Sequence, residues 1–123
     1  LALEDHPPFG DRMVDFLRIL DLVDDLRLKV NLDTSNCLRV GDDPVQLTRA
    51  VSDRVVHLHV SDVSSSMAHV PSGDGVVDLH AVFLVLKQRG YDGWLSSEAG
   101  GPPTEESIVR SADNIRRLWR EAR

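Results

Sequence analysis

A strand-like run followed by a helix-like stretch occurs four times in this chain, and this repetition constrains its fold most. Each run is short and apolar, and each following segment has apolar residues at helical spacing. The expected strands are 1–5, 28–33, 54–62 and 94–98, and the expected helices begin near residues 11, 43, 78 and 104. Parallel strands need crossover connections, which helices usually supply. The pattern predicts one α/β domain over residues 1–123, built on a parallel four-stranded sheet.

The third expected strand is unusual because a β-branched, apolar run carries two histidines. Strand side chains alternate between the two faces of a sheet. The alternation predicts Val55, His57, His59 and Ser61 on one face, and Val56, Leu58 and Val60 on the other. A polar face backed by an apolar one suits a strand whose inner side carries a site. We expect the Ser- and Gly-rich stretch 64–77 to be a long loop, and Tyr91 and Trp94 to be packing residues.

Each expected strand also delivers an ionisable residue to the same face near its C-terminal end. These residues are Glu4, Asp33, His59 and Glu98. In parallel α/β folds the C-terminal strand ends meet at one rim, where ligands bind. Three clustered carboxylates would repel one another unless a cation held them together. Oxygen ligands with one imidazole favour Mn²⁺ or Mg²⁺, with Co²⁺ or Zn²⁺ as alternatives.

Composition excludes several other classes of protein. The net charge is -6 and no basic stripe occurs, so we expect no nucleic-acid partner. Neither a long apolar run nor a signal-peptide pattern is present, so we expect no membrane partner. The single Cys37 argues against disulfides and suits the cytoplasm. Because the chain opens on Leu1, inside an apparent strand, we expect a processed, truncated or split piece.

Five motifs follow one another along nearly the whole chain. They are LEDH at 3–6, LDTSN at 32–36, HLHVSD at 57–62, HVPSGDGVVD at 69–78 and GYDGWLSSE at 90–98. Together, and in this order, they resemble the xylose-isomerase-like barrels. That family includes sugar-phosphate isomerases and epimerases and the second family of apurinic-site endonucleases. The resemblance implies a TIM-type (β/α)₈ barrel, of which this chain is the (βα)₄ half formed by strands five to eight.

The resemblance also implies roles for individual residues. The family's metal ligands correspond to Glu4, Asp33, His59 and Glu98, the four residues found from strand alternation. In the isomerases and epimerases a metal holds a hydroxy-ketone while two glutamates, here Glu4 and Glu98, move a proton through an enediolate. The substrate-binding candidates are His6, Asn36, Asp62 and His69. Two of them have an alternative: His6 can instead cap the Pro7-Pro8 turn, and His69 can be a solvated loop residue.

Three positions depart from the family pattern. Asn36 stands where the family often has a histidine, and an amide hydrogen-bonds a hydroxyl but is a poor metal ligand. This departure weakens the resemblance to the trinuclear-zinc nucleases. Asp62 stands where ketose 3-epimerases tend to have glutamate, and Ser61 where a lysine is common. The substrate subclass therefore stays open.

The sequence thus predicts a metal-dependent isomerase or epimerase of a sugar, sugar phosphate or polyol. One alternative is a dehydratase of the same family, acting on cyclic polyols or shikimate-pathway acids. The other is a catalytically silent half-barrel that serves as a structural or partner subunit. The expected partners are a small polyhydroxy-carbonyl substrate and either an N-terminal half-barrel or a second copy of the chain, because four strands leave two sheet edges unpaired.

Overall fold

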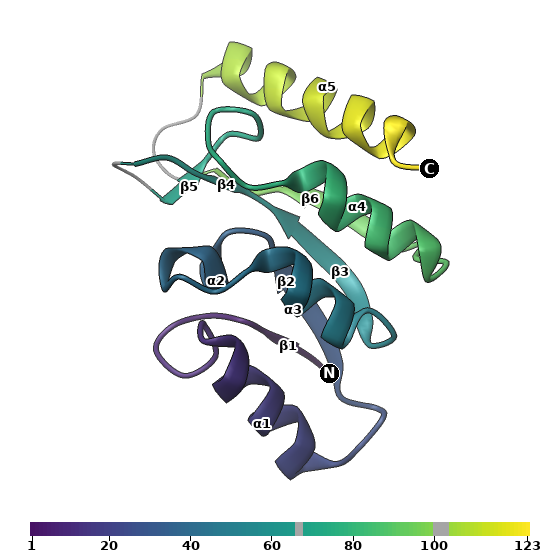
Figure 1. The fold of residues 1–123 in the computed structure, drawn as a ribbon. Coiled ribbons are helices and arrows are strands. Elements are labelled where there is room, and N and C mark those ends of the chain that lie inside the picture. Colours follow the sequence, from purple (N-terminus) through teal and green to yellow (C-terminus); the bar gives the residue numbers. More distant parts are fainter. Residues whose placement is uncertain (66–67, 100–103) are drawn as a thin grey trace.

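The structure is a computed structural model that describes residues 1–65, 68–99 and 104–123 (Figure 1). Its main sheet is parallel and contains, in spatial order, β1 (Ala2–Glu4), β2 (Lys29–Asp33), β3 (Val55–Val60) and β6 (Trp94–Ser97). The helices are α1 (Met13–Val23), α2 (Asn36–Arg39), α3 (Pro44–Val51), α4 (Leu79–Gln88) and α5 (Glu105–Glu121). The predicted α/β fold with a parallel sheet is confirmed. Within the described ranges, no helix has the length and apolar character needed to cross a membrane.

The helices pack against one face of the sheet (Figure 1). The strand residues in this core are the alternate apolar positions, and the helices contribute aromatic and aliphatic side chains. The innermost members are Val30, Leu32, Leu58 and Val60 from the strands and Phe16, Leu47, Phe83 and Leu86 from the helices, none more than 1% exposed. Burying each such side chain stabilises the fold by about 1.5–3 kcal/mol. The polar residues between the apolar strand positions are therefore directed to the other face.

Side-chain caps fix where the crossover helices begin. The Asp43 carboxylate accepts from Val45 N at 2.8 Å, and that of Asp78 accepts from Ala81 N at 2.9 Å. Thr104 forms a reciprocal capping box with Ser107 at the start of α5. These contacts satisfy N–H groups that have no partner within the helix. The sequence placed these three helix starts correctly.

The first residues of β3 do not follow the predicted alternation. Val55 pairs with Val30 and His57 pairs with Asn31, so β3 has one extra residue, Val56, between these two pairs. Such an insertion is a β-bulge. Val55 consequently joins the buried core, whereas Val56 is 44% exposed. The predicted faces of Val55 and Val56 were therefore wrong. Beyond the bulge, His57 and His59 keep the predicted face.

The stretch 64–77 is not a plain loop, contrary to the prediction, although residues 66 and 67 lie outside the described residues. It contains β5 (Ala68–Val70), which pairs antiparallel with β4 (Asp62–Val63). The buried Asp62 carboxylate organises this hairpin by accepting from four backbone N–H groups at 2.8–3.1 Å. The donors are Val63, Gly73, Gly75 and Val77. A Cβ on Gly75 would overlap Asp62 Oδ1, so only glycine fits there.

The two aromatic residues near β6 differ in their surroundings. Tyr91 packs edge-on against Trp119 with ring centroids 6.2 Å apart, and burial raises the pKa of its hydroxyl to about 12. Trp94 is 79% exposed, so the prediction that it packs within the chain was wrong. Trp94 is the first residue of β6, and the next residue, Leu95, packs against the core under the helices. The Trp94 side chain therefore lies on the opposite face of the sheet.

Candidate metal centre

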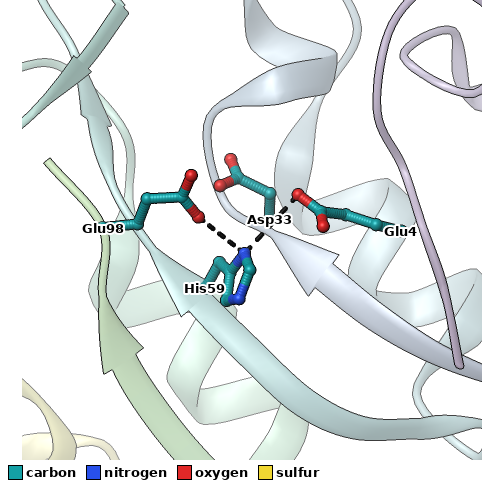
Figure 2. Close-up of side chains that lie close together, drawn as sticks. All are labelled: Glu4, Asp33, His59 and Glu98. Carbon is teal, nitrogen blue, oxygen red and sulfur yellow. Dashed lines mark ion pairs between the residues drawn. The ribbon is translucent and has the colours of Figure 1, made fainter. Parts of the chain in front are cut away.

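Four ionisable side chains converge at the C-terminal ends of the parallel strands. Glu4 ends β1, Asp33 ends β2, and His59 lies near the end of β3. Glu98 follows β6 directly, and its N–H donates to Val60 O at 2.9 Å, which continues the strand pairing. One ligand atom from each of the four residues lies within 4.8 Å of the others. Figure 2 shows the Glu4 and Glu98 carboxylates directed toward the His59 ring, with the Asp33 carboxylate beside them.

The His59 ring lies between the two glutamates. Its Nδ1 is 2.6 Å from Glu98 Oε2 and 3.5 Å from Glu4 Oε1 (Figure 2). Carboxylate oxygens and imidazole nitrogens bind divalent ions at about 2.0–2.2 Å, so atoms that share one ion lie roughly 3–4 Å apart. The four ligand atoms lie within 4.8 Å of one another, slightly wider than this range, so small side-chain movements would bring them around one ion. The donor set therefore fits one divalent cation.

Asp33 is the most firmly held of the four residues. It is fully buried, and its Oδ1 accepts from Ser35 N, Ser35 Oγ and Asn36 N at 2.7, 2.8 and 3.0 Å. The buried Ser61 Oγ lies 3.1 and 3.2 Å from the two carboxylate oxygens. Oδ2 is thus the less occupied oxygen and the one available to an ion. The alternation had placed Ser61 on this face, but its contact with Asp33 was missed.

Asn31 is a site residue that the sequence reasoning missed. Its Nδ2 donates to Glu4 Oε2 at 3.2 Å and lies 3.4 and 3.3 Å from Nδ1 and Nε2 of His59. Asn31 is two residues before Asp33 in β2, so the two side chains share a face of the sheet. A polar residue at this position of an otherwise apolar strand was the available signal.

A second polar pair lies next to His59. His57 Nε2 and Ser96 Oγ are 2.8 Å apart, which links β3 to β6. The His57 ring meets the His59 ring edge-on, at a centroid distance of 5.2 Å and an interplanar angle of 89°. This contact restricts the orientation of the His59 imidazole.

Two of the predicted substrate-binding residues lie at the centre. His69 Nε2 donates to Asn36 Oδ1 at 3.0 Å, because an amide oxygen can only accept. His69 Nδ1 is 3.5 Å from Glu98 Oε1, and the His69 side chain is only 17% exposed. The alternative that His69 is a solvated loop residue was therefore wrong. Its placement depends on the hairpin, which no local sequence pattern indicated.

The other two predicted substrate-binding residues make contacts that suit local structure. His6 is exposed, and its Nδ1 lies 2.7 Å from Pro7 O, as the turn-capping alternative expected. The Asp62 carboxylate is directed to the backbone N–H groups of the hairpin. These contacts favour structural roles, and we do not include either residue in the substrate site proposed below.

Buried polar groups surround the centre. Asp5 is fully buried, and its Oδ1 accepts from Asp33 N at 2.7 Å, while burial raises the pKa of its carboxyl well above the ordinary value. Within the described ranges, three buried polar atoms near the ligands have no hydrogen-bond partner: Asp5 Oδ2, Asn31 Oδ1 and Asn36 Nδ2. Such atoms are rare in folded proteins. Their position around four candidate ligands fits a site that binds a further group.

Comparison with known proteins identifies the family. The model of the xylose isomerase-like TIM barrel family matches residues 1–118, so the chain belongs to that family. The predicted recognition is confirmed at this level.

Individual relatives are more distant. The inosose dehydratase of Lacticaseibacillus casei is 26% identical over 107 residues, which cover 72% of this chain and 36% of the relative. A D-tagatose 3-epimerase-like protein superposes with a TM-score of 0.80 at 22% identity, covering 98% of this chain and 47% of that one. The IOLI protein, solved with a binding zinc atom, gives a TM-score of 0.76 at 19% identity, covering 99% and 49%. This chain thus spans a third to a half of these proteins.

Proposed function

We propose that this chain carries the metal centre of an isomerase or epimerase that acts on a sugar, sugar phosphate or polyol-derived ketone through an enediolate. The observation that carries the proposal is the convergence of three carboxylates and one imidazole, with ligand atoms within 4.8 Å of one another. Family membership supports it, since relatives include proteins named as epimerases and dehydratases.

The ligands of the ion would be Glu4, Asp33, His59 and Glu98. We propose Mn²⁺ or Mg²⁺, with Co²⁺ or Zn²⁺ as alternatives, because the set is rich in oxygen and contains one nitrogen. The IOLI protein was solved with a binding zinc atom, which supports a divalent ion as the cofactor. When bound, the ion would stabilise the negative charge that develops on the enediolate oxygens.

Two glutamates would move the proton. Glu98 would take a proton from the carbon next to the carbonyl, and the C–H electron pair would form the enediolate double bond. Glu4 would return a proton to the neighbouring carbon or to the opposite face. Their strands support this division, because β1 and β6 are the outer strands of the described sheet and approach the centre from opposite sides. Asn36 and His69, beside Glu98, would hydrogen-bond substrate hydroxyls.

A dehydratase is the second candidate, and the inosose dehydratase relatives favour it. It would begin with the same proton abstraction, followed by loss of a neighbouring hydroxyl as water. The two reactions differ in product mass, because isomerisation conserves mass and dehydration removes one water. Mass spectrometry of the products of hydroxy-ketones and inososes with Mn²⁺ present distinguishes them. The silent half-barrel alternative requires that neither reaction occurs.

We also propose that an N-terminal half-barrel or a second copy of the chain completes the barrel. Among the described strands, β1 and β6 each have a neighbour on only one side of the main sheet. Unpaired edges and an uncovered inner face favour association. Sedimentation at micromolar concentration is expected to show an assembly, and a stable, well-folded monomer would contradict the proposal.

Solvent-deuterium exchange at the carbon next to the carbonyl tests the proton transfer. With Mn²⁺ present, Glu98→Gln and Glu4→Gln are each expected to slow exchange and turnover by about 10²–10⁴-fold, the usual contribution of general acid–base catalysis. Glu106→Gln on the exposed start of α5 is the matched control and should leave both unchanged. Undiminished exchange in both site variants would remove the glutamates from the mechanism.

A further inference from the structure

We propose that Asn31 is a positioning residue that holds Glu4 and His59 as a pair in the geometry that the ion requires. The inference rests on the proposed function, because it assumes that these two residues are ligands. Asn31 itself is not proposed to touch the ion or the substrate.

The contacts of the Asn31 amide carry the proposal. Its Nδ2 reaches two of the four candidate ligands, at 3.2 Å from Glu4 Oε2 and 3.3–3.4 Å from the His59 ring nitrogens. The two ligands belong to β1 and β3, and Asn31 lies in β2 between them. A single side chain therefore links ligands from the strands on both sides of its own.

The hydrogen bond to Glu4 also selects which oxygen remains for the ion. Oε2 is engaged by Asn31, whereas Oε1 is the oxygen that lies 3.5 Å from His59 Nδ1. Glu4 would then bind through one oxygen only. Groups that hydrogen-bond ligands in this way orient them and raise the affinity for the metal.

Folding alone does not explain an amide at this position. Asn31 lies between Val30 and Leu32, both in the core, and its Oδ1 is buried with no partner among the described residues. A buried polar group without a hydrogen bond destabilises a fold. An apolar residue would avoid that cost, so the amide is better explained by its contacts with the ligands.

Asn114 provides a matched control, because it is also a half-buried asparagine and its amide links α5 to the segment after β5. Its Nδ2 donates to Ser72 Oγ at 2.9 Å, and its Oδ1 accepts from Arg117 at 2.7 Å. Neither partner is one of the four candidate ligands. Asn114→Ala thus removes a comparable amide contact away from the centre.

The experiment is a Mn²⁺ titration by calorimetry of wild type, Asn31→Leu, Asn31→Ala and Asn114→Ala, with Co²⁺ absorption spectra of each. Removing a group that orients metal ligands typically weakens binding 10–100-fold. We expect that loss in both Asn31 variants, with an altered Co²⁺ spectrum, and a change below twofold with an unaltered spectrum in Asn114→Ala. Asn31→Ala keeps the test valid if the larger leucine prevents folding.

The outcomes separate this inference from the proposed function. If wild type binds neither ion, the metal centre itself is wrong and this inference falls with it. If wild type binds and the Asn31 variants bind within twofold of it, the inference alone is overturned. It is equally overturned if the metal-free melting temperature falls in these variants while the Co²⁺ spectrum stays that of wild type, because Asn31 is then only structural.

Discussion

Asp33 and Glu98 stand at the C-terminal ends of two strands of the main sheet, β2 and β6, yet their surroundings are opposite. Asp33 is fully buried, and its carboxylate accepts from Ser35, Asn36 and Ser61. The Glu98 side chain is 41% exposed, and its described contacts are with the rings of His59 and His69. One carboxylate is fixed by the backbone and by hydroxyls, whereas the other, within the part of the chain that is described, contacts imidazoles and is partly exposed.

The difference indicates different tasks within one centre. A carboxylate held by several donors loses little freedom when it binds an ion, so Asp33 suits permanent ligation. A proton carrier must reach the reacting carbon and change its protonation state, which suits the more exposed Glu98. The comparison therefore predicts that similar substitutions at the two positions will damage different properties.

The largest expected effect is on the affinity for Mn²⁺, which distinguishes the role of Asp33 from that of Glu98. Asp33→Asn should weaken Mn²⁺ binding by at least about 100-fold, because the amide is a poor ligand and disturbs a fixed hydrogen-bond set. Glu98→Gln should weaken it less, since the amide oxygen of this partly exposed side chain is not held by other donors among the described residues and can still reach the ion. Calorimetric titration of both variants measures this. Equal losses would erase the proposed distinction between the two carboxylates.

Ser61→Ala should have a smaller effect of the same kind. The variant removes the hydroxyl that contacts both oxygens of Asp33. We expect about tenfold weaker Mn²⁺ binding and a loss of about 1–3 kcal/mol in the free energy of unfolding, as for a buried hydrogen bond to a charged group. Urea unfolding and metal titration measure the two quantities. Ser65→Ala, an exposed serine in the stretch after β4, is the control. A variant with wild-type affinity would show that Asp33 does not depend on this donor.

Strand alternation explains why the positions of the four candidate ligands could be predicted from the sequence. Glu4, Asp33, His59 and Glu98 lie on parallel strands, where side-chain direction has a strict period of two. The buried Leu32 and Leu58 on the opposite face set the direction of their neighbours. The site positions followed from local patterns, and the matching family model supports the fold that brings them together.

The features that were missed depend on contacts between distant residues. The bulge at Val56 depends on how β3 pairs with β2, which alternation within one strand does not reveal. The hairpin that carries His69 is organised by the Asp62 carboxylate and the N–H groups up to Val77, fifteen residues later. Asn31 contacts candidate ligands that lie on two other strands. Local sequence contains no signal for these pairings, so only the folded chain shows them.

The smallest expected effects concern Cys37, a core residue that follows Asn36 in α2 and reports how well water is excluded near Asp33. The thiol is fully buried, and burial, assisted by nearby carboxylates including Asp5, raises its pKa to about 12. The thiolate fraction at pH 8 is then roughly 10⁻⁴, and the thiolate is the reactive form. A disulfide reagent should therefore label Cys37 at least about 100-fold more slowly in the native protein than in urea. Rapid native labelling would show that the Asp33 side opens as readily as the Glu98 side.

The raised pKa of Cys37 also predicts the direction of the alkaline stability change. The folded state holds the thiol neutral, whereas in the unfolded chain it ionises near its ordinary value of 9.0. The unfolded state therefore binds fewer protons above pH 9, and the fold loses stability there as pH rises toward 12. One such group contributes a slope of at most about 1.4 kcal/mol per pH unit.

Cys37→Ala removes the thiol, so the free energy of unfolding of this variant should fall less steeply between pH 8 and pH 10.5 than that of wild type. Tyr91→Phe is the comparison, because the hydroxyl of Tyr91 ionises from a higher ordinary value of 10.0 and its effect begins about one unit later. Parallel curves for wild type and Cys37→Ala would mean that water reaches the thiol, and the closed surroundings of Asp33 would then be wrong.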